Sequence, residues 1–146
     1  MRPALRNTTG MLLAFVVASA IMMIVESVNG KVLYPALGKA AEGMTDKEAI
    51  RQIMASAPIG ALLVVLGGWA LGTLAGAFVV ARIAAREIGR QVMIFGWIIA
   101  FAGIMNNLML PPPAWFWVAG VVVPLAVAFL VARSVSGWPA APPREG

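Results

Sequence analysis

The chain has no cysteine and no histidine, and these two absences remove most familiar kinds of catalytic or metal site. Without cysteine there is no disulfide, no thiolate nucleophile and no cysteine-ligated metal. Without histidine there is no imidazole for acid–base catalysis or for metal ligation. The glycine-rich phosphate-binding motifs of nucleotide-binding proteins are missing as well. We therefore expect a protein that is not an enzyme, with no catalytic residue, no metal site and no cofactor.

Charge is also scarce, because only 12% of the residues are charged whereas 61% are hydrophobic. A soluble domain has about 25% charged residues. One soluble core could not bury this much apolar surface, but a lipid bilayer can accept it. The net charge of +5 could indicate a nucleic-acid partner. The basic residues instead flank apolar stretches, which is typical of membrane topology, so we expect contact with the lipid bilayer and no nucleic acid.

Four apolar stretches are long enough to cross a membrane, since a spanning helix needs about 20 such residues. They run over roughly residues 9–29, 58–83, 91–110 and 114–132. Backbone groups in lipid must be hydrogen-bonded within a helix. The predicted fold is therefore all-α, a four-helix transmembrane bundle over residues 1–133. Residues 134–146, rich in proline and small residues, are predicted to form a flexible cytoplasmic tail.

The basic residues predict the orientation, because cytoplasmic segments carry more lysine and arginine. One side has seven: Arg2, Arg6, Arg82, Arg86, Arg90, Arg133 and Arg144. The other has four: Lys31, Lys39, Lys47 and Arg51. We therefore expect a multi-pass protein of a bacterial inner (plasma) membrane with both termini cytoplasmic.

A cleaved signal peptide is the competing interpretation of the first stretch. Ala18-Ser19-Ala20 has the form of a cleavage site. The apolar run continues through Val25, however, which favours a spanning helix.

The loop between the first two stretches is external in this orientation, and its sequence predicts one helix. Thr45 and Glu48 fit a capping box at the start of a helix. Ile50, Ile53 and Met54 then share one face. We expect a short amphipathic helix at the external membrane interface.

Three glycines in the second stretch, Gly68, Gly72 and Gly76, recur every four residues like a glycine zipper. Such a stripe lets another backbone approach closely. The approaching helix could belong to the same bundle, to a second copy or to a partner protein, and the sequence leaves all three open. Trp69 lies nearby at mid-membrane depth, where a packing role is expected.

Trp115 and Trp117 follow three adjacent prolines, which predict a tight hairpin between the last two stretches. Tryptophan is common at membrane interfaces. We expect both residues to act as interface anchors.

Four polar residues are expected at one depth. Glu26, the only acidic residue within an apolar stretch, and Asn29 lie toward the external end of the first, and Asn106 and Asn107 lie toward the same end of the third. An ionisable residue in the membrane is by default a functional hypothesis. The four could form a site for an ion, a proton or a polar headgroup, or they could only hydrogen-bond between helices.

The order of several short motifs resembles a group of small uncharacterised four-span bacterial inner-membrane proteins. The motifs are Glu26 with Leu33-Tyr34-Pro35, Gly68-Trp69 with Gly72 and Gly76, and Asn106 to Trp115-Phe116. The resemblance implies the same four-span topology and no particular activity. The lone Glu26 also suggests the small multidrug resistance transporters, but those proteins are shorter and lack the long external loop.

Two functions follow. The first is an accessory or structural subunit of a membrane complex or a homo-oligomer, which the glycine stripe and the missing catalytic residues favour. The alternative is a small ion-coupled transporter or channel that uses Glu26.

Overall fold

The computed structural model describes residues 3–137, which are all-helical apart from short connections. Four helices in this range are long and apolar enough to cross a membrane. They are α1 (Pro3–Val28) with its continuation η1 (Asn29–Leu33), α4 (Ile59–Ile83), α5 (Ile88–Met109) and α6 (Ala114–Val135). The expected all-α, four-helix transmembrane bundle is confirmed. The connection between η1 and α4 contains two short helices, α2 (Pro35–Ala41) and α3 (Lys47–Ala55).

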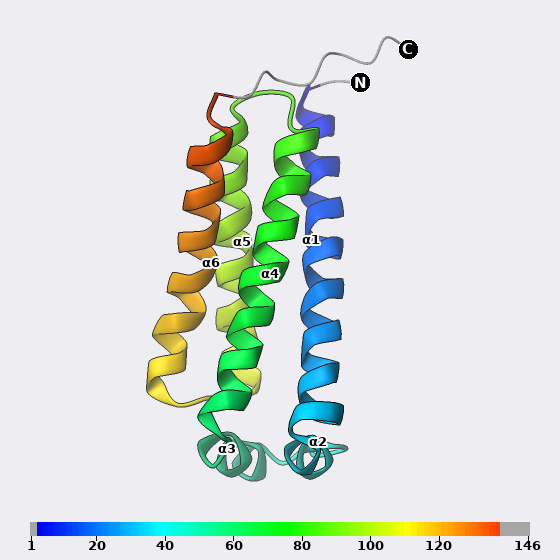
Figure 1. Ribbon diagram of the computed structural model, residues 1–146, viewed down its shortest axis with the longest axis vertical. Helices are drawn as coiled ribbons and strands as arrows, with labels where there is room; N and C mark the ends of the chain where they lie inside the picture. Colours follow the sequence, from blue (N-terminus) through cyan, green and yellow to red (C-terminus); the bar gives the residue numbers. More distant parts are fainter. Residues whose placement is uncertain (1–2, 138–146) are drawn as a thin grey trace.

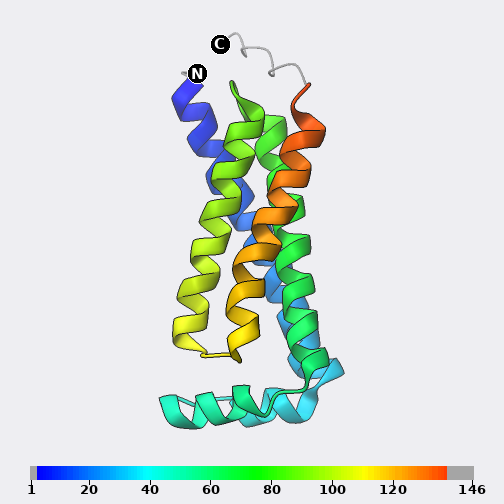
Figure 2. The same ribbon diagram turned by 90° about the vertical axis from the view of Figure 1, so that its left-hand side faces the viewer.

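The four long helices stand side by side, and α2 and α3 lie across one end of them (Figure 1). We call this the α2–α3 end, and the opposite end, where α1 begins and α6 finishes, the terminal end. The central helix is α4, which packs against α1, α5 and α6. Helix α1 packs mainly on α4 and crosses the bundle obliquely (Figure 2). It therefore has little contact with α5.

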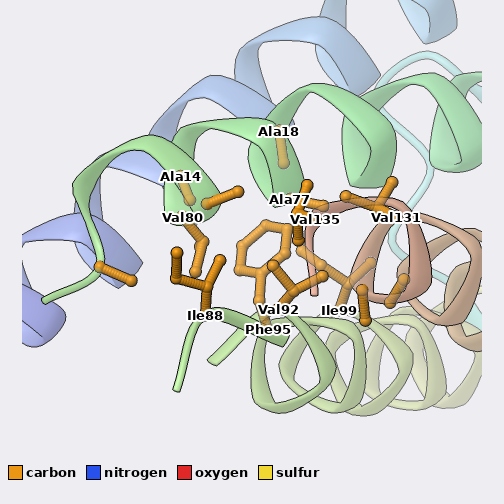
Figure 3. Close-up of a cluster of buried hydrophobic side chains, with 14 residues drawn as sticks. Ala14, Ala18, Ala77, Val80, Ile88, Val92, Phe95, Ile99, Val131 and Val135 are labelled. Atoms are coloured by element: carbon orange, nitrogen blue, oxygen red, sulfur yellow. The ribbon is translucent and has the colours of Figure 1, made fainter. Parts of the chain in front are cut away.

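The terminal half of the bundle is filled by apolar side chains. Phe95 lies at the middle of this cluster with none of its surface exposed, and side chains of all four long helices surround it (Figure 3). The buried members are Ala14, Ala18, Ala77, Val80, Ala81, Ala84, Ile88, Val92, Phe95, Ile99, Ala128, Val131, Ala132 and Val135.

The glycine stripe of α4 faces α1 of the same chain. A Cβ added at Gly72 would lie 2.8 Å from the carbonyl oxygen of Ala18, and one added at Gly76 would lie 2.9 Å from that of Ala14. A Cβ at Gly68 would lie 2.9 Å from Val25 Cγ1. Real Cβ atoms do not approach this closely, so the three glycines allow α1 to pack on α4. The groove is thus filled from within the chain and is not open to a second copy.

The start of α1 is joined to the loop between α4 and α5. Arg6 donates from Nε to the carbonyl oxygen of Ile83 at 2.9 Å and from Nη2 to that of Ala84 at 3.2 Å. The backbone N–H of Ala85 donates to the side-chain oxygen of Asn7 at 2.8 Å. The two bonds from Arg6 satisfy carbonyl groups that the end of α4 leaves unpaired and place a positive charge at its negative pole.

Several element ends differ from the sequence-based expectation. Helix α1 begins at Pro3, not near residue 9, and its continuation runs to Leu33 with a π-type hydrogen bond from the N–H of Tyr34 to the carbonyl of Asn29. Helix α6 continues through Val135, so the predicted tail begins within a helix, and residues 138–146 of that tail lie outside the described residues.

The expected amphipathic helix is present as α3, but the predicted cap is wrong. Asp46, not Thr45, caps this helix, because its carboxylate accepts a hydrogen bond from the N–H of Ala49 at 2.7 Å. Glu48 does not reach back to complete a capping box. It instead pairs with Arg51 at 3.2 Å. Helix α2 had no clear sequence signal.

Candidate functional site

Glu26 is exposed on α1 near the α2–α3 end and lines the same cavity as Trp69 of α4. The indole N–H of Trp69 can only donate, so it complements the carboxylate of Glu26. Among the described residues, no lysine or arginine forms a salt bridge with Glu26. Its negative charge is therefore not neutralised by a neighbouring side chain.

Trp69 occupies the middle of the bundle and is only 4% exposed. A Cβ added at Gly103 of α5 would lie 2.6 Å from its Cζ3 atom, and one at Gly120 of α6 would lie 2.9 Å from the same atom. Its ring also packs edge-to-face on Phe116, with the ring centroids 5.7 Å apart. Trp69 thus has the packing role expected of it and, in addition, lines a cavity together with Glu26.

Glu26 lines three adjoining cavities at the α2–α3 end. The lateral cavity, about 160 Å³, lies between α1 and α5 and is also lined by Ser19, Trp69 and Asn106. The rim cavity, about 490 Å³, lies between the end of α1 and α2 and is also lined by charged Lys31, Lys39 and Glu42.

The third, the roofed cavity, measures about 240 Å³ and lies between the bundle and the layer formed by α2 and α3. All four residues of the predicted polar cluster, Glu26, Asn29, Asn106 and Asn107, line it. The rest of its wall is mostly apolar. These residues are Gly30, Leu37, Gly38, Ala41, Ile53, Met54, Ala57, Ala61, Leu62, Val65, Leu110 and Phe116.

Two of the asparagines are buried with incomplete hydrogen bonding. Asn29 donates from Nδ2 to the carbonyl oxygen of Ala61 at 3.1 Å, but its Oδ1 has no partner among the described residues. Asn107 is 1% exposed, and neither of its amide atoms has such a partner. An unpaired buried polar group costs about 1–3 kcal/mol. Helix-to-helix bonding therefore accounts for only part of this polar cluster.

Within residues 3–137, all three of these cavities lie toward the α2–α3 end. Beyond the lateral cavity, toward the terminal end, the apolar cluster around Phe95 fills the space between the helices (Figure 3). The chain thus has a hollow, polar α2–α3 end and a packed, apolar terminal half.

Other predicted residues lie apart from these cavities. Trp115 is exposed at the start of α6 and packs edge-to-face on Phe116, with centroids 5.6 Å apart, while Trp117 is half-buried. Within residues 3–137, no three histidine, cysteine, aspartate or glutamate side chains cluster as a metal site would require.

Sequence reasoning missed that Trp69 lines a cavity together with Glu26 and missed Gly120 as a wall of the Trp69 site. Spacing along one helix shows which residues share its face, but not which neighbouring helix that face meets. The π-type turn at Asn29 was missed too. Such turns are often found at functional sites.

Comparisons of the chain with models of known protein families, with curated proteins and with solved structures found no match.

Proposed function

We propose that this small integral membrane protein is an accessory subunit that contributes α1 to a membrane complex or a homo-oligomer. One observation carries the proposal: only 11% of the apolar window of α1 is buried within the chain, against 28–44% for the other three spans. Helix α1 thus leaves a larger share of its span uncovered by its own bundle than the other spans do.

The two faces of α1 differ in the size of their side chains. The face on α4 includes Ala14 and Ala18, which are fully buried. The free face has large apolar side chains: Leu12, Leu13, Val16, Met23 and Ile24 are between 48% and 69% exposed. Helix association in lipid is driven by van der Waals packing, for which this free apolar surface is available.

The packed terminal half also favours an accessory role over a channel. A channel needs a polar path across the membrane, and the apolar cluster around Phe95 lies between the polar cavities and the terminal end. Transport by this chain would require that cluster to open.

Photo-cross-linking tests the role of α1. A benzoylphenylalanine introduced at Val16 of α1, which is 64% exposed, should form a discrete adduct with a membrane protein in cells. The same residue introduced at Leu130 of α6, which is 65% exposed, is the matched control and should react only with lipid. The adduct mass separates a partner from a second copy. Lipid adducts alone at Val16 would remove the support for this function.

A second candidate, an ion-coupled transporter, has one specific observation in its favour. Glu26 lines the rim cavity, which contains charged residues, and also the lateral cavity, which extends toward the bundle centre. Proton flux into liposomes under an imposed pH gradient tests it. Glu26→Gln should abolish that flux in a transporter without lowering the melting temperature. In an accessory subunit no flux should be seen, Glu26→Gln should be nearly silent, and Glu26→Leu should destabilise the chain.

We also propose a bacterial inner-membrane location with both termini cytoplasmic. The excess of basic residues near the terminal end supports this orientation. The external side is then the α2–α3 end, where the three cavities lie.

A further inference from the structure

We propose that the roofed cavity binds a protonated primary amine attached to an apolar body, with the ammonium group between Glu26 and the side-chain amides of Asn29 and Asn107. This binding site is independent of the accessory role, because that role depends on other, apolar side chains of α1. Either proposal can fail without the other.

The ligand's charge and hydrogen-bonding groups follow from the atoms that lack partners. Oδ1 of Asn29 and Oδ1 of Asn107 are buried acceptors without a donor, and Nδ2 of Asn107 is a buried donor without an acceptor. Glu26 adds a carboxylate that forms no salt bridge among the described residues. No lysine or arginine lines this cavity. The wall of the roofed cavity therefore has more unpaired hydrogen-bond acceptors than unpaired donors. A primary ammonium group has three N–H donors and one positive charge, which match this excess.

Both unpaired acceptors are present whichever way the side-chain amides of Asn29 and Asn107 are oriented. One amide atom of Asn29 contacts the carbonyl oxygen of Ala61, so that atom must be nitrogen and the unpartnered one must be oxygen. Both atoms of Asn107 lack partners, so either flip leaves an unpaired acceptor. The χ2 angle of asparagine is broad, and rotation about it turns this acceptor toward the ligand.

The size and walls of the cavity define the apolar body. Its volume of about 240 Å³ exceeds the roughly 150 Å³ of an engineered apolar cavity that holds benzene. Leu37 and Met54 from the α2–α3 layer and Leu62 and Phe116 from the bundle supply apolar wall. A short alkyl chain or a single aromatic ring therefore fits beside the polar group.

This chemistry has two possible sources, a free amphiphilic amine and the headgroup of phosphatidylethanolamine. The lipid would place its phosphate in the adjoining rim cavity, which Lys31 and Lys39 line. A free amine has no phosphate group for these lysines to bind. Lys31→Gln therefore weakens binding of the lipid and leaves binding of the free amine unchanged.

The test uses the full chain in nanodiscs of phosphatidylcholine, whose quaternary headgroup has no N–H donor. Octylamine should raise the melting temperature by several degrees more than octyltrimethylammonium or 1-octanol at the same concentration, because ligands that bind only the folded state stabilise it. Glu26→Gln should weaken octylamine binding at least roughly ten-fold, the effect of losing one charge-assisted hydrogen bond. Glu42→Gln is the matched control, since Glu42 lines only the rim cavity, and should bind octylamine like the wild type.

The lipid arm replaces phosphatidylcholine with phosphatidylethanolamine. If the lipid is the source, the melting temperature rises and added octylamine gives no further shift. If the free amine is the source, the octylamine shift persists in both lipids. The proposal is overturned if octylamine stabilises no more than octyltrimethylammonium and phosphatidylethanolamine no more than phosphatidylcholine.

Asn107→Leu separates a binding role from a structural one. Without ligand its melting temperature should equal or exceed that of the wild type, because the substitution removes an unpaired buried amide, while the octylamine shift should shrink. A lower melting temperature with an undiminished octylamine shift would contradict the proposed role of this amide. Should the variant not fold, the Glu26→Gln and Glu42→Gln pair decides the question alone.

Discussion

Trp69 and Glu26 line the same lateral cavity, so the centre of the bundle adjoins its only intramembrane carboxylate within the described residues. The indole ring is held in place by two glycines, Gly103 and Gly120, which leave room for it on α5 and α6. The position of Glu26 at the three cavities is thus tied to packing among all four long helices.

Replacing Trp69 should separate the contribution of its ring from that of its N–H donor. Trp69→Ala should lower the free energy of unfolding by about 3–5 kcal/mol, because it leaves a large cavity in the core. Trp69→Phe keeps most of the ring and loses the N–H donor, so a loss of about 1–2 kcal/mol is expected. Unfolding of the purified variants in detergent measures both. Equal losses would mean that ring volume contributes nothing.

Adding a methyl group to the glycine stripe should destabilise the packing of α1 on α4. Gly72→Ala places a Cβ 2.8 Å from the Ala18 carbonyl oxygen, so the helices must move apart, at an expected cost of about 1–3 kcal/mol. Gly67→Ala on the same helix is the matched control, because no atom lies within 4 Å of the added Cβ. If thermal melting in detergent shows equal stability for the two variants, the account of the groove is wrong.

The bonds from Arg6 to the α4–α5 loop should contribute to stability independently of its charge. Arg6→Lys keeps the positive charge, and hence the topology signal, but cannot reproduce the two-point contact with Ile83 and Ala84. We expect a loss of about 0.5–1.5 kcal/mol in the free energy of unfolding. Arg133→Lys, at an exposed position in the last turn of α6, should change stability much less. If both variants lose a similar amount of stability, the effect comes from replacing any arginine with lysine and not from the contacts of Arg6.

The orientation can be tested directly, because the chain has no cysteine of its own. A cysteine introduced at Lys39 in α2 should react with a membrane-impermeant thiol reagent on intact cells. One introduced at Ser136, just after α6, should react only after the cells are opened. The reverse pattern would mean that the terminal end is external.

The sequence alone was sufficient to predict the class of protein and its spanning helices. Length and apolar composition determine which segments cross a membrane, since a helix is the only structure that satisfies the backbone of a single segment in lipid. The prolines at 111–113 likewise separate α5 from α6, because proline disfavours the helical conformation of the residue before it. These are local properties, so neighbouring residues determine them.

The site depended on contacts that are remote in sequence. The equal depth of Glu26, Asn29, Asn106 and Asn107 followed from topology, but their shared cavity required α2 and α3 to fold across the bundle end. The glycine stripe had several possible partners, and only tertiary packing placed α1 against it. Lipid contributes no hydrophobic force that would select one neighbour for a helix. Shape complementarity between distant side chains makes that selection, and the tertiary structure is where it becomes visible.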